Sequence, residues 1–270
     1  MTNTNKNRSK GNVACIAASL AALGMIGLPL AGGMAGCKGA LGGVSKSQEI
    51  QMGQQAAQQV DAKSRFITSG PEYDRLQRVA GRIFPLARKD YDVPFSIKLI
   101  DSKEINAFAL PGGPIYFYSG LMDLASSDDE VASVLGHEAT HIVKRHSVKQ
   151  IADAQTKGLI AQIALGKSSN MIQALANIGL QLDQLHFSRN DEAQADENGF
   201  RYLTQAGYNP EAMSSFFRKM GAKTGTGGTE FLSNHPLTKK RIAAADERAR
   251  AYEQTHGIVG SPTVQNSGNN

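Results

Sequence analysis

The sequence has little net charge outside its first residues and none of the compositional biases of fibrous or disordered proteins. Of the five net positive charges, Lys6, Arg8 and Lys10 supply three, and residues 1–36 contain no acidic residue, which leaves +2 for residues 37–270. Proteins that bind nucleic acid usually carry a strongly basic patch, so this balance indicates no nucleic-acid partner. Collagen, a long coiled coil and wholesale disorder are not indicated either.

Cysteine is also scarce, since Cys15 and Cys37 are the only two residues of this type. Cys15 lies inside an apolar N-terminal run, and removal of that run would leave one cysteine and no possible internal disulfide. Beyond residue 37 the chain has no apolar run that is long and clean enough to cross a membrane. Cys37 therefore needs an explanation other than pairing.

The N-terminus is ordered like a secretory signal. Residues 1–10 are polar and positively charged, residues 13–35 carry no charge, and Met34-Ala35-Gly36-Cys37 follows. This ending resembles a bacterial lipobox, in which the cysteine after two small residues is lipidated and becomes the first residue of the mature protein. We therefore expect a lipoprotein-type signal peptide over 1–36 and lipidation of Cys37.

The membrane connection has two interpretations. Lipidation of Cys37 would make the protein a periplasm-facing lipoprotein of the cell envelope, and Lys38, in place of an aspartate that favours inner-membrane retention, indicates the outer membrane. The uncharged run is also long enough to span a bilayer, so a permanent transmembrane anchor is the alternative. In either case we expect the rest of the chain to lie outside the cytoplasm and to be tethered to a membrane.

Length and apolar content predict one main domain. The chain has 270 residues, 41% of them hydrophobic, which is enough for a substantial core. We expect the lipidated cysteine and a flexible tether over 37–46, the main domain over 47–255 and a disordered polar tail over 256–270. Periodicity predicts helices over 47–60, 71–87, 127–146, 147–165, 170–185, 188–203 and 239–254, and strands over 95–100 and 114–118. The expected fold class is α+β, mostly helical, with a small sheet.

The segment between the two predicted strands has the features of a sheet edge. Residues 106–113 end in Pro-Gly-Gly, and Pro111 and Pro114 would each remove a hydrogen-bond donor from a central strand. We therefore expect this stretch at the edge of the sheet. An open edge could pair with an extended peptide by β-augmentation, and a simple edge hairpin is the alternative.

The stretch His137-Glu138-Ala139-Thr140-His141 carries the clearest chemical pattern, HExxH. On a helix, His137 and His141 lie four residues apart on one face, so both imidazoles can reach a single ion. Glu138 points about 100° away, where a general base for a metal-activated water has to stand. A pair of histidines on a solvated helix is the alternative reading of this spacing.

Capping signals support a helix over 127–146. Ser127 and Glu130 have the spacing of a capping box, and Lys144 and Arg145 suit the negative end of the helix dipole. Five apolar residues recur at helical spacing and predict a buried inner side, namely Val131, Val134, Leu135, Ile142 and Val143.

A second helical pattern offers a third ligand. Glu192 and Asp196 are also four residues apart, so one helical face presents two carboxylates. Two histidines and one carboxylate with an open fourth position form a recognised catalytic zinc set. Asp196 could then accept the spare N–H of a ligand histidine and fix its tautomer.

Four ordered motifs together resemble a known protease family. They are His137-Glu138-x-x-His141, Glu192-x-x-x-Asp196, the stretch over residues 106–113 and Asn234-His235-Pro236. This set is similar to the gluzincin family that contains the CaaX prenyl endopeptidase, the HtpX heat-shock protease, the mitochondrial Oma protease and small bacterial lipoprotein proteases. The resemblance covers roughly residues 47–250, and it implies a zincin-like metalloprotease domain with an HExxH active-site helix.

The resemblance also implies roles for particular residues. It assigns one zinc ion per chain to His137, His141 and Glu192, and the role of catalytic base to Glu138. Asp196 would not bind the metal itself but would contact one of the ligand histidines. His235 matches a histidine that in some relatives lies near the metal, either as a ligand at rest or as a group that stabilises the transition state. The resemblance assigns no role to two other histidines, His146 and His186, which are expected to be solvated or part of the core.

The function expected from these residues is zinc-dependent hydrolysis of peptide bonds, with misfolded or envelope proteins as the substrates that the resemblance implies. Two alternatives remain. A lipoprotein chaperone or assembly factor could carry the same site in a structural or autoinhibited form, and a metallohydrolase could act on a non-peptide substrate. The oligomeric state is left open.

Overall fold

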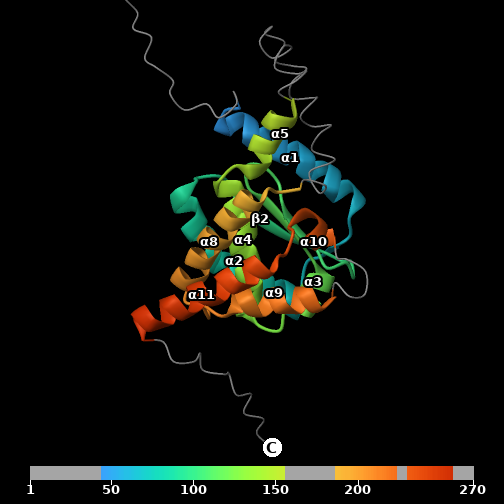
Figure 1. Cartoon of the computed structure of the whole chain (residues 1–270). Coiled ribbons are helices and arrows are strands. Elements are labelled where there is room, and N and C mark those ends of the chain that lie inside the picture. The colour runs from blue at the N-terminus through green and yellow to red at the C-terminus, as the bar shows by residue number, and fades with distance from the viewer. Residues whose placement is uncertain (1–43, 156–185, 224–229, 258–270) are drawn as a thin grey trace, which may run out of the picture. The chain divides into compact units, whose positions relative to one another are not determined.

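The computed structural model describes residues 44–155, 186–223 and 230–257. The expected signal peptide, Cys37 and most of the tether lie outside these ranges, as do the predicted helix over 170–185, the end of the helix over 147–165 and nearly all of the tail. The helices are α1 (Lys46–Lys63), α2 (Pro71–Asp90), α3 (Ser119–Leu124), α4 (Asp128–Val143), α5 (His146–Gln155), α8 (Arg189–Gln205), α9 (Ala212–Lys223), α10 (Glu230–Asn234) and α11 (Lys239–His256), and the strands are β1 (Phe66–Ile67), β2 (Ser96–Ile100), β3 (Ala107–Ala109) and β4 (Pro114–Tyr118) (Figure 1). The predicted class, α+β and mostly helical with a small sheet, is confirmed.

The sheet has the strand order β1-β2-β4-β3. Strands β2 and β4 run parallel, whereas β1 pairs with β2 and β3 with β4 in the antiparallel sense. Strand β3 is at the edge, as predicted for the stretch over 106–113. Pro114 was also interpreted as a sign of the sheet edge, and for this residue the prediction is wrong, because β4 lies between β2 and β3 inside the sheet. Pro114 is tolerated there because it is the first residue of the strand, and its carbonyl still accepts a hydrogen bond from Leu110 N–H at 2.8 Å.

The two faces of the sheet are covered by different helices. Alternate residues of a strand point to opposite faces. Ile115 and Phe117 of β4 belong to the core that contains α2 and α4, whereas Tyr116 between them packs with Met52 and Ala56 of α1. None of the helices within the described ranges is both long and apolar enough to cross a membrane.

Helix α4 is the central element of the fold. It packs against α2, α8, α9 and β3, and every residue from Glu130 to Ile142 is buried (Figure 1). The sequence predicted one buried side, but neighbours on several sides leave no solvated face. The polar residues of α4 therefore all lie in the protein interior, where each needs a partner.

The start of α4 differs from the predicted capping box. Ser127 Oγ accepts a hydrogen bond from Glu130 N–H at 3.2 Å, as expected. The reciprocal bond is absent in the described structure, because Glu130 Oε2 accepts from Ser126 N–H and from Lys219 Nζ, both at 2.7 Å. Glu130 thus ties the start of α4 to α9 instead of closing its own cap.

The end of α4 also differs from the prediction, since the helix stops at Val143 and not at 146. Arg145 has a left-handed backbone with φ of 56°, and α5 starts at the next residue in a new direction. Arg145 Nε donates to the buried Glu49 of α1 at 2.6 Å, and its Nη2 donates to Val44 O at 2.7 Å. These contacts offset the strain of an unfavourable backbone and fix where α5 begins.

Helix α9 was not predicted, although its pattern is readable. Met213, Phe216, Phe217 and Met220 are buried at helical spacing. The two-residue strand β1 was also missed, because so short a segment has no periodicity to detect.

Helices α4 and α8 approach each other so closely that only glycine fits at the contact. A methyl group on Gly136 of α4 would lie 2.8 Å from Gly199 O of α8, and one on Gly199 would lie 2.8 Å from His137 N. Both obstacles are backbone atoms, which cannot move aside as a side chain does. This contact brings the acidic residues of α8 within reach of the histidines of α4.

We therefore predict that Gly199→Ala destabilises the protein, although alanine is the better helix former. The expected loss in the free energy of unfolding is about 1–3 kcal/mol, because the backbones must separate. Gly81 of α2 is the matched control, since a methyl group there has no atom within 4 Å. Gly81→Ala should stabilise by about 0.5–1 kcal/mol. Urea denaturation of both variants tests this, and stabilisation by Gly199→Ala would show that the close contact is not limiting.

Candidate metal centre

The two histidines of α4 meet as their spacing predicts. His137 and His141 lie one helical turn apart, and their Nε2 atoms are separated by 3.1 Å. Their exposed fractions are 3% and 1%, so neither ring is solvated. The alternative of a polar pair on a solvated helix is therefore wrong.

Helix α8 brings a carboxylate to the same point. Ser188 and Asp191 form a reciprocal capping box at its start, with both backbone N–H groups donating to the partner side chain at 3.1 Å. The box fixes the first turn of α8, which carries Glu192. Glu192 Oε2 lies 3.6 Å from His137 Nε2, and Glu192 Oε1 lies 3.6 Å from His141 Nε2.

A third imidazole comes from the turn between α10 and α11. His235 Nδ1 lies 2.9 Å from Glu192 Oε1 and 3.2 Å from His137 Nε2. Its backbone N–H donates to Phe231 O at 2.8 Å, and its ring stacks on that of Phe231 at a centroid distance of 4.7 Å. The ring is therefore held in place at 1% exposure.

The four side chains fit a metal ion. One ligand atom from each of His137, His141, Glu192 and His235 lies within 4.8 Å of the others. A tetrahedral zinc ion with bonds of about 2.1 Å has ligand atoms roughly 3.4 Å apart. Five of the separations, those to Glu192 measured to either of its oxygens, range from 2.9 to 3.6 Å and so lie near that value. Imidazole and carboxylate are also the ligand types that zinc takes in catalytic sites.

The outer nitrogen of His137 is held by Asp196. His137 Nδ1 donates to Asp196 Oδ1 at 3.0 Å, which leaves the Nε2 lone pair of the neutral ring facing the cluster. Arg241 donates to both oxygens of Asp196, at 2.7 and 2.8 Å. Burial alone would raise the pKa of Asp196, but the hydrogen bonds from His137 and Arg241 outweigh burial and lower this pKa to about 2. Asp196 is therefore a carboxylate at neutral pH.

Arg241 connects the two carboxylates of α8. Besides its contacts to Asp196, its Nη1 lies 2.5 Å from Glu192 Oε2. Burial would raise the pKa of Glu192, but the nearby His235, His137 and Arg241 lower it. Sequence reasoning did not identify Arg241, because nothing in the α11 pattern distinguishes it from its neighbours Lys239 and Lys240.

The outer nitrogen of His141 meets another imidazole. His146 Nδ1 lies 3.0 Å from His141 Nδ1, and His146 is fully buried. Burial lowers the pKa of His146 to about 4, so its ring is neutral and can accept at Nδ1. Its Nε2 then carries a proton and faces Asp191 Oδ1 at 3.5 Å. A core position was among the roles expected for His146, but its contact with a candidate ligand was missed.

His186 does not belong to the cluster. It is exposed, and its Nδ1 donates to Ser233 O at 2.7 Å. Of the two roles expected for His186, solvent-exposed or part of the core, the structure thus agrees with the first.

Glu138 lies beside the cluster, as its position in the helical turn predicts. It is 1% exposed, and its Oε1 is 3.5 Å from His235 Nε2. That oxygen has no hydrogen-bond partner within the described residues. Burial raises the pKa of Glu138, against the lowering effect of His235 and His137. A buried carboxylate with a free oxygen and a raised pKa is suited to taking up a proton.

Comparison with known proteins agrees with this chemistry. Residues 72–249 match the model of Peptidase family M48. The chain is 33% identical to the mitochondrial metalloendopeptidase OMA1 of Schizosaccharomyces pombe, over 76% of this chain and 62% of that protein. It is 30% identical to the beta-barrel assembly-enhancing protease of Escherichia coli, over 76% of this chain and 45% of that protein. It is 28% identical to metalloprotease LoiP of E. coli, over 77% of this chain and 83% of that protein. The chain thus spans less than two thirds of the first two relatives.

We predict that the contact between His146 and His141 strengthens metal binding. His146→Leu removes the acceptor for His141 Nδ1 and should weaken zinc affinity about 10- to 100-fold. His146→Asn, whose side-chain oxygen can replace Nδ1 as acceptor, should retain most of the affinity. The measurement is competition for zinc against a chromophoric chelator.

The control for this series is His256→Leu, since His256 is exposed at the end of α11. It should bind zinc like the parent. Equal zinc affinity of His146→Leu and the parent, with circular dichroism showing an intact fold, would contradict the role of His146.

Proposed function

Because the chain belongs to peptidase family M48, we propose that it is a zinc-dependent endopeptidase whose zinc is held by His137, His141 and Glu192. The observation that carries this proposal is the convergence of four buried ligand atoms beside a buried carboxylate that has a free oxygen. Structural zinc sites have no need of such a carboxylate, whereas hydrolysis does.

Zinc in such a site supplies a Lewis acid that polarises a peptide carbonyl and makes water nucleophilic near neutral pH. The remaining steps belong to side chains of the protein. Glu138 takes a proton from the attacking water and delivers it to the nitrogen of the scissile bond as that bond breaks. Asp196 keeps the proton of His137 on Nδ1, and Arg241 keeps Asp196 and Glu192 charged and in position. Burial of the whole set strengthens the electrostatic interactions between these groups.

His235 has two possible duties, both compatible with its position. Its Nδ1 faces Glu192 and His137, and its Nε2 faces Glu138. As a fourth zinc ligand it would close the site at rest, and a substrate would have to displace it. With its ring turned away from the metal, it would instead donate to the carbonyl oxygen of the substrate during attack. Its place in a turn between two helices suits either role.

Polypeptides are the proposed substrates, and strand β3 supports this class. It is the edge of the sheet and packs against α4, which carries the histidines. An extended substrate could pair with the side of β3 that no other strand of the described ranges occupies, and could then lie along the site. We further propose that lipidation of Cys37 tethers the protein to a membrane in the cell envelope, facing the periplasm, and that misfolded envelope proteins are cleaved there.

A chaperone or assembly factor with a closed zinc site is the second candidate. The observation in its favour is the distance of 2.9 Å between His235 and Glu192, because four protein ligands are typical of structural zinc. The two candidates differ in whether an unfolded protein is cut or only bound.

We predict that Glu138→Gln abolishes cleavage and leaves zinc binding intact. The amide cannot accept a proton, so cleavage of an unfolded model protein by the zinc-loaded full chain should fall at least about a hundredfold. Zinc content should stay at one ion per chain. Full activity of this variant would disprove the assignment of the base, and an inactive parent that binds the unfolded protein would favour the chaperone.

Glu192→Ala is expected to weaken the binding of zinc. Loss of a ligand should reduce zinc content after dialysis against a weak chelator, and activity should fall with it. Glu197→Ala is the matched control, because Glu197 is exposed on the same helix. If the Glu192→Ala variant retained zinc at the parental ratio, Glu192 would not be a ligand.

A further inference from the structure

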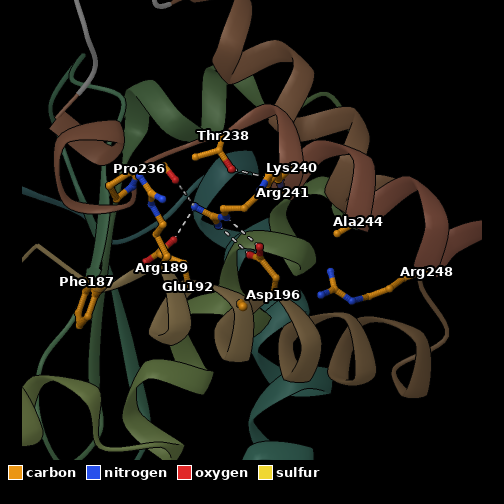
Figure 2. A pocket seen from close by; sticks show the side chains of 11 residues that line it. Phe187, Arg189, Glu192, Asp196, Pro236, Thr238, Lys240, Arg241, Ala244 and Arg248 are labelled. Atoms are coloured by element: carbon orange, nitrogen blue, oxygen red, sulfur yellow. Dashed lines mark hydrogen bonds and ion pairs between the residues drawn. The ribbon is translucent and has the colours of Figure 1, made fainter.

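A cavity of about 240 Å³ opens beside the metal cluster, between α8 and α11 (Figure 2). Glu192, Asp196 and Arg241 form the wall that it shares with the cluster. A group bound in this cavity would therefore lie next to the candidate zinc ligand Glu192. None of the roles proposed above uses this space.

The walls of the cavity combine apolar surface with uncompensated positive charge. Phe187, Ala193, Pro236 and Ala244 supply the apolar part. Arg241 also lines the cavity, but its charge is balanced by Asp196 and Glu192. Arg189, Lys240 and Arg248 are the other cations, and no carboxylate of the described chain pairs with any of these three.

Arg248 gives the most specific indication of a ligand. Its Nη1 is buried and has no hydrogen-bond partner among the residues that the structure describes. A buried donor without an acceptor costs about 1–3 kcal/mol, and more when the group is charged. Figure 2 shows its side chain reaching from α11 towards the side of the cavity where Asp196 lies. No hydrogen bond or ion pair joins Arg248 to Asp196 among the described residues, so an anion from outside is the natural partner of Arg248.

We infer that this cavity is a substrate subsite for an acidic side chain, with glutamate as its best occupant. The methylene groups of glutamate suit the apolar walls, and its carboxylate would accept from Arg248, with Arg189 and Lys240 adding attraction. The inference rests on the proposed endopeptidase function, because the acidic residue would lie among those that flank the scissile bond. It adds a sequence preference to that function.

The test measures binding separately from cleavage. Two fluorescent peptides with capped ends differ only in one central residue, glutamate or glutamine, and carry no other charge. Their dissociation constants for the zinc-loaded full chain with Glu138→Gln are measured by fluorescence anisotropy. The glutamate peptide should bind about tenfold more tightly or better, which is the gain expected from a charge-assisted hydrogen bond.

Variants of Arg248 test whether the preference for the glutamate peptide arises in the cavity. In the same background, Arg248→Gln should bring the two dissociation constants within about twofold of each other. Arg248→Glu should reverse the preference in favour of a peptide with lysine at the central position. Arg250→Gln, two residues along α11 at an exposed position outside the cavity, should keep the parental ratio.

The outcomes separate the two claims. Equal binding of the glutamate and glutamine peptides would overturn the subsite, even if the parent protein cuts both. A glutamate preference that survives Arg248→Gln would also overturn it, because the preference would then arise elsewhere. Absence of cleavage by the parent would contradict the endopeptidase alone, and the binding ratio would still decide the subsite.

Discussion

The contact between the backbones of α4 and α8 determines what the rest of the structure can do. Gly136 and Gly199 leave out the side chains that would hold the two helices apart. Glu192 therefore reaches the histidines of α4, and Asp196 reaches His137 Nδ1 at 3.0 Å. A larger separation would place the carboxylates of α8 beyond the reach of one metal ion. Two glycines that take no part in the chemistry thus allow the candidate metal-binding side chains of the two helices to come together.

Close packing creates an electrostatic problem, which the surrounding residues solve. Glu138, Glu192 and Asp196 are all buried, and isolated carboxylates are costly in such a place. Arg241 pairs directly with Glu192 and Asp196, and the three imidazoles of the cluster surround Glu192. In the proposed endopeptidase, a zinc ion would add further positive charge. Glu138 Oε1 has no hydrogen-bond partner among the described residues, and this agrees with the proposal that Glu138 exchanges protons with the substrate.

Features that depend on the spacing of nearby residues were predictable from the sequence, and features that depend on contacts between distant residues were not. The pairs His137 with His141 and Glu192 with Asp196 each lie four residues apart on a helix, so their shared faces followed from the sequence. The contact of His146 depends on the left-handed turn at Arg145, which is held by Glu49 at a distance of 96 residues in the chain. No local pattern reports such a turn. Likewise, the direction of α11 brings Arg241 to α8, and its helical periodicity does not specify that direction.

The central claim is that His137, His141, Glu192 and His235 surround one metal ion. X-ray diffraction at the zinc absorption edge, from crystals of the protein grown with zinc, tests this most directly. The account predicts one anomalous peak per chain between these four side chains, with bonds of about 2.0–2.2 Å to His137, His141 and Glu192. A bond to His235 in the same map would identify the closed resting state. Absence of a peak there, with zinc bound elsewhere or the four side chains hydrogen-bonded to one another, would contradict the account.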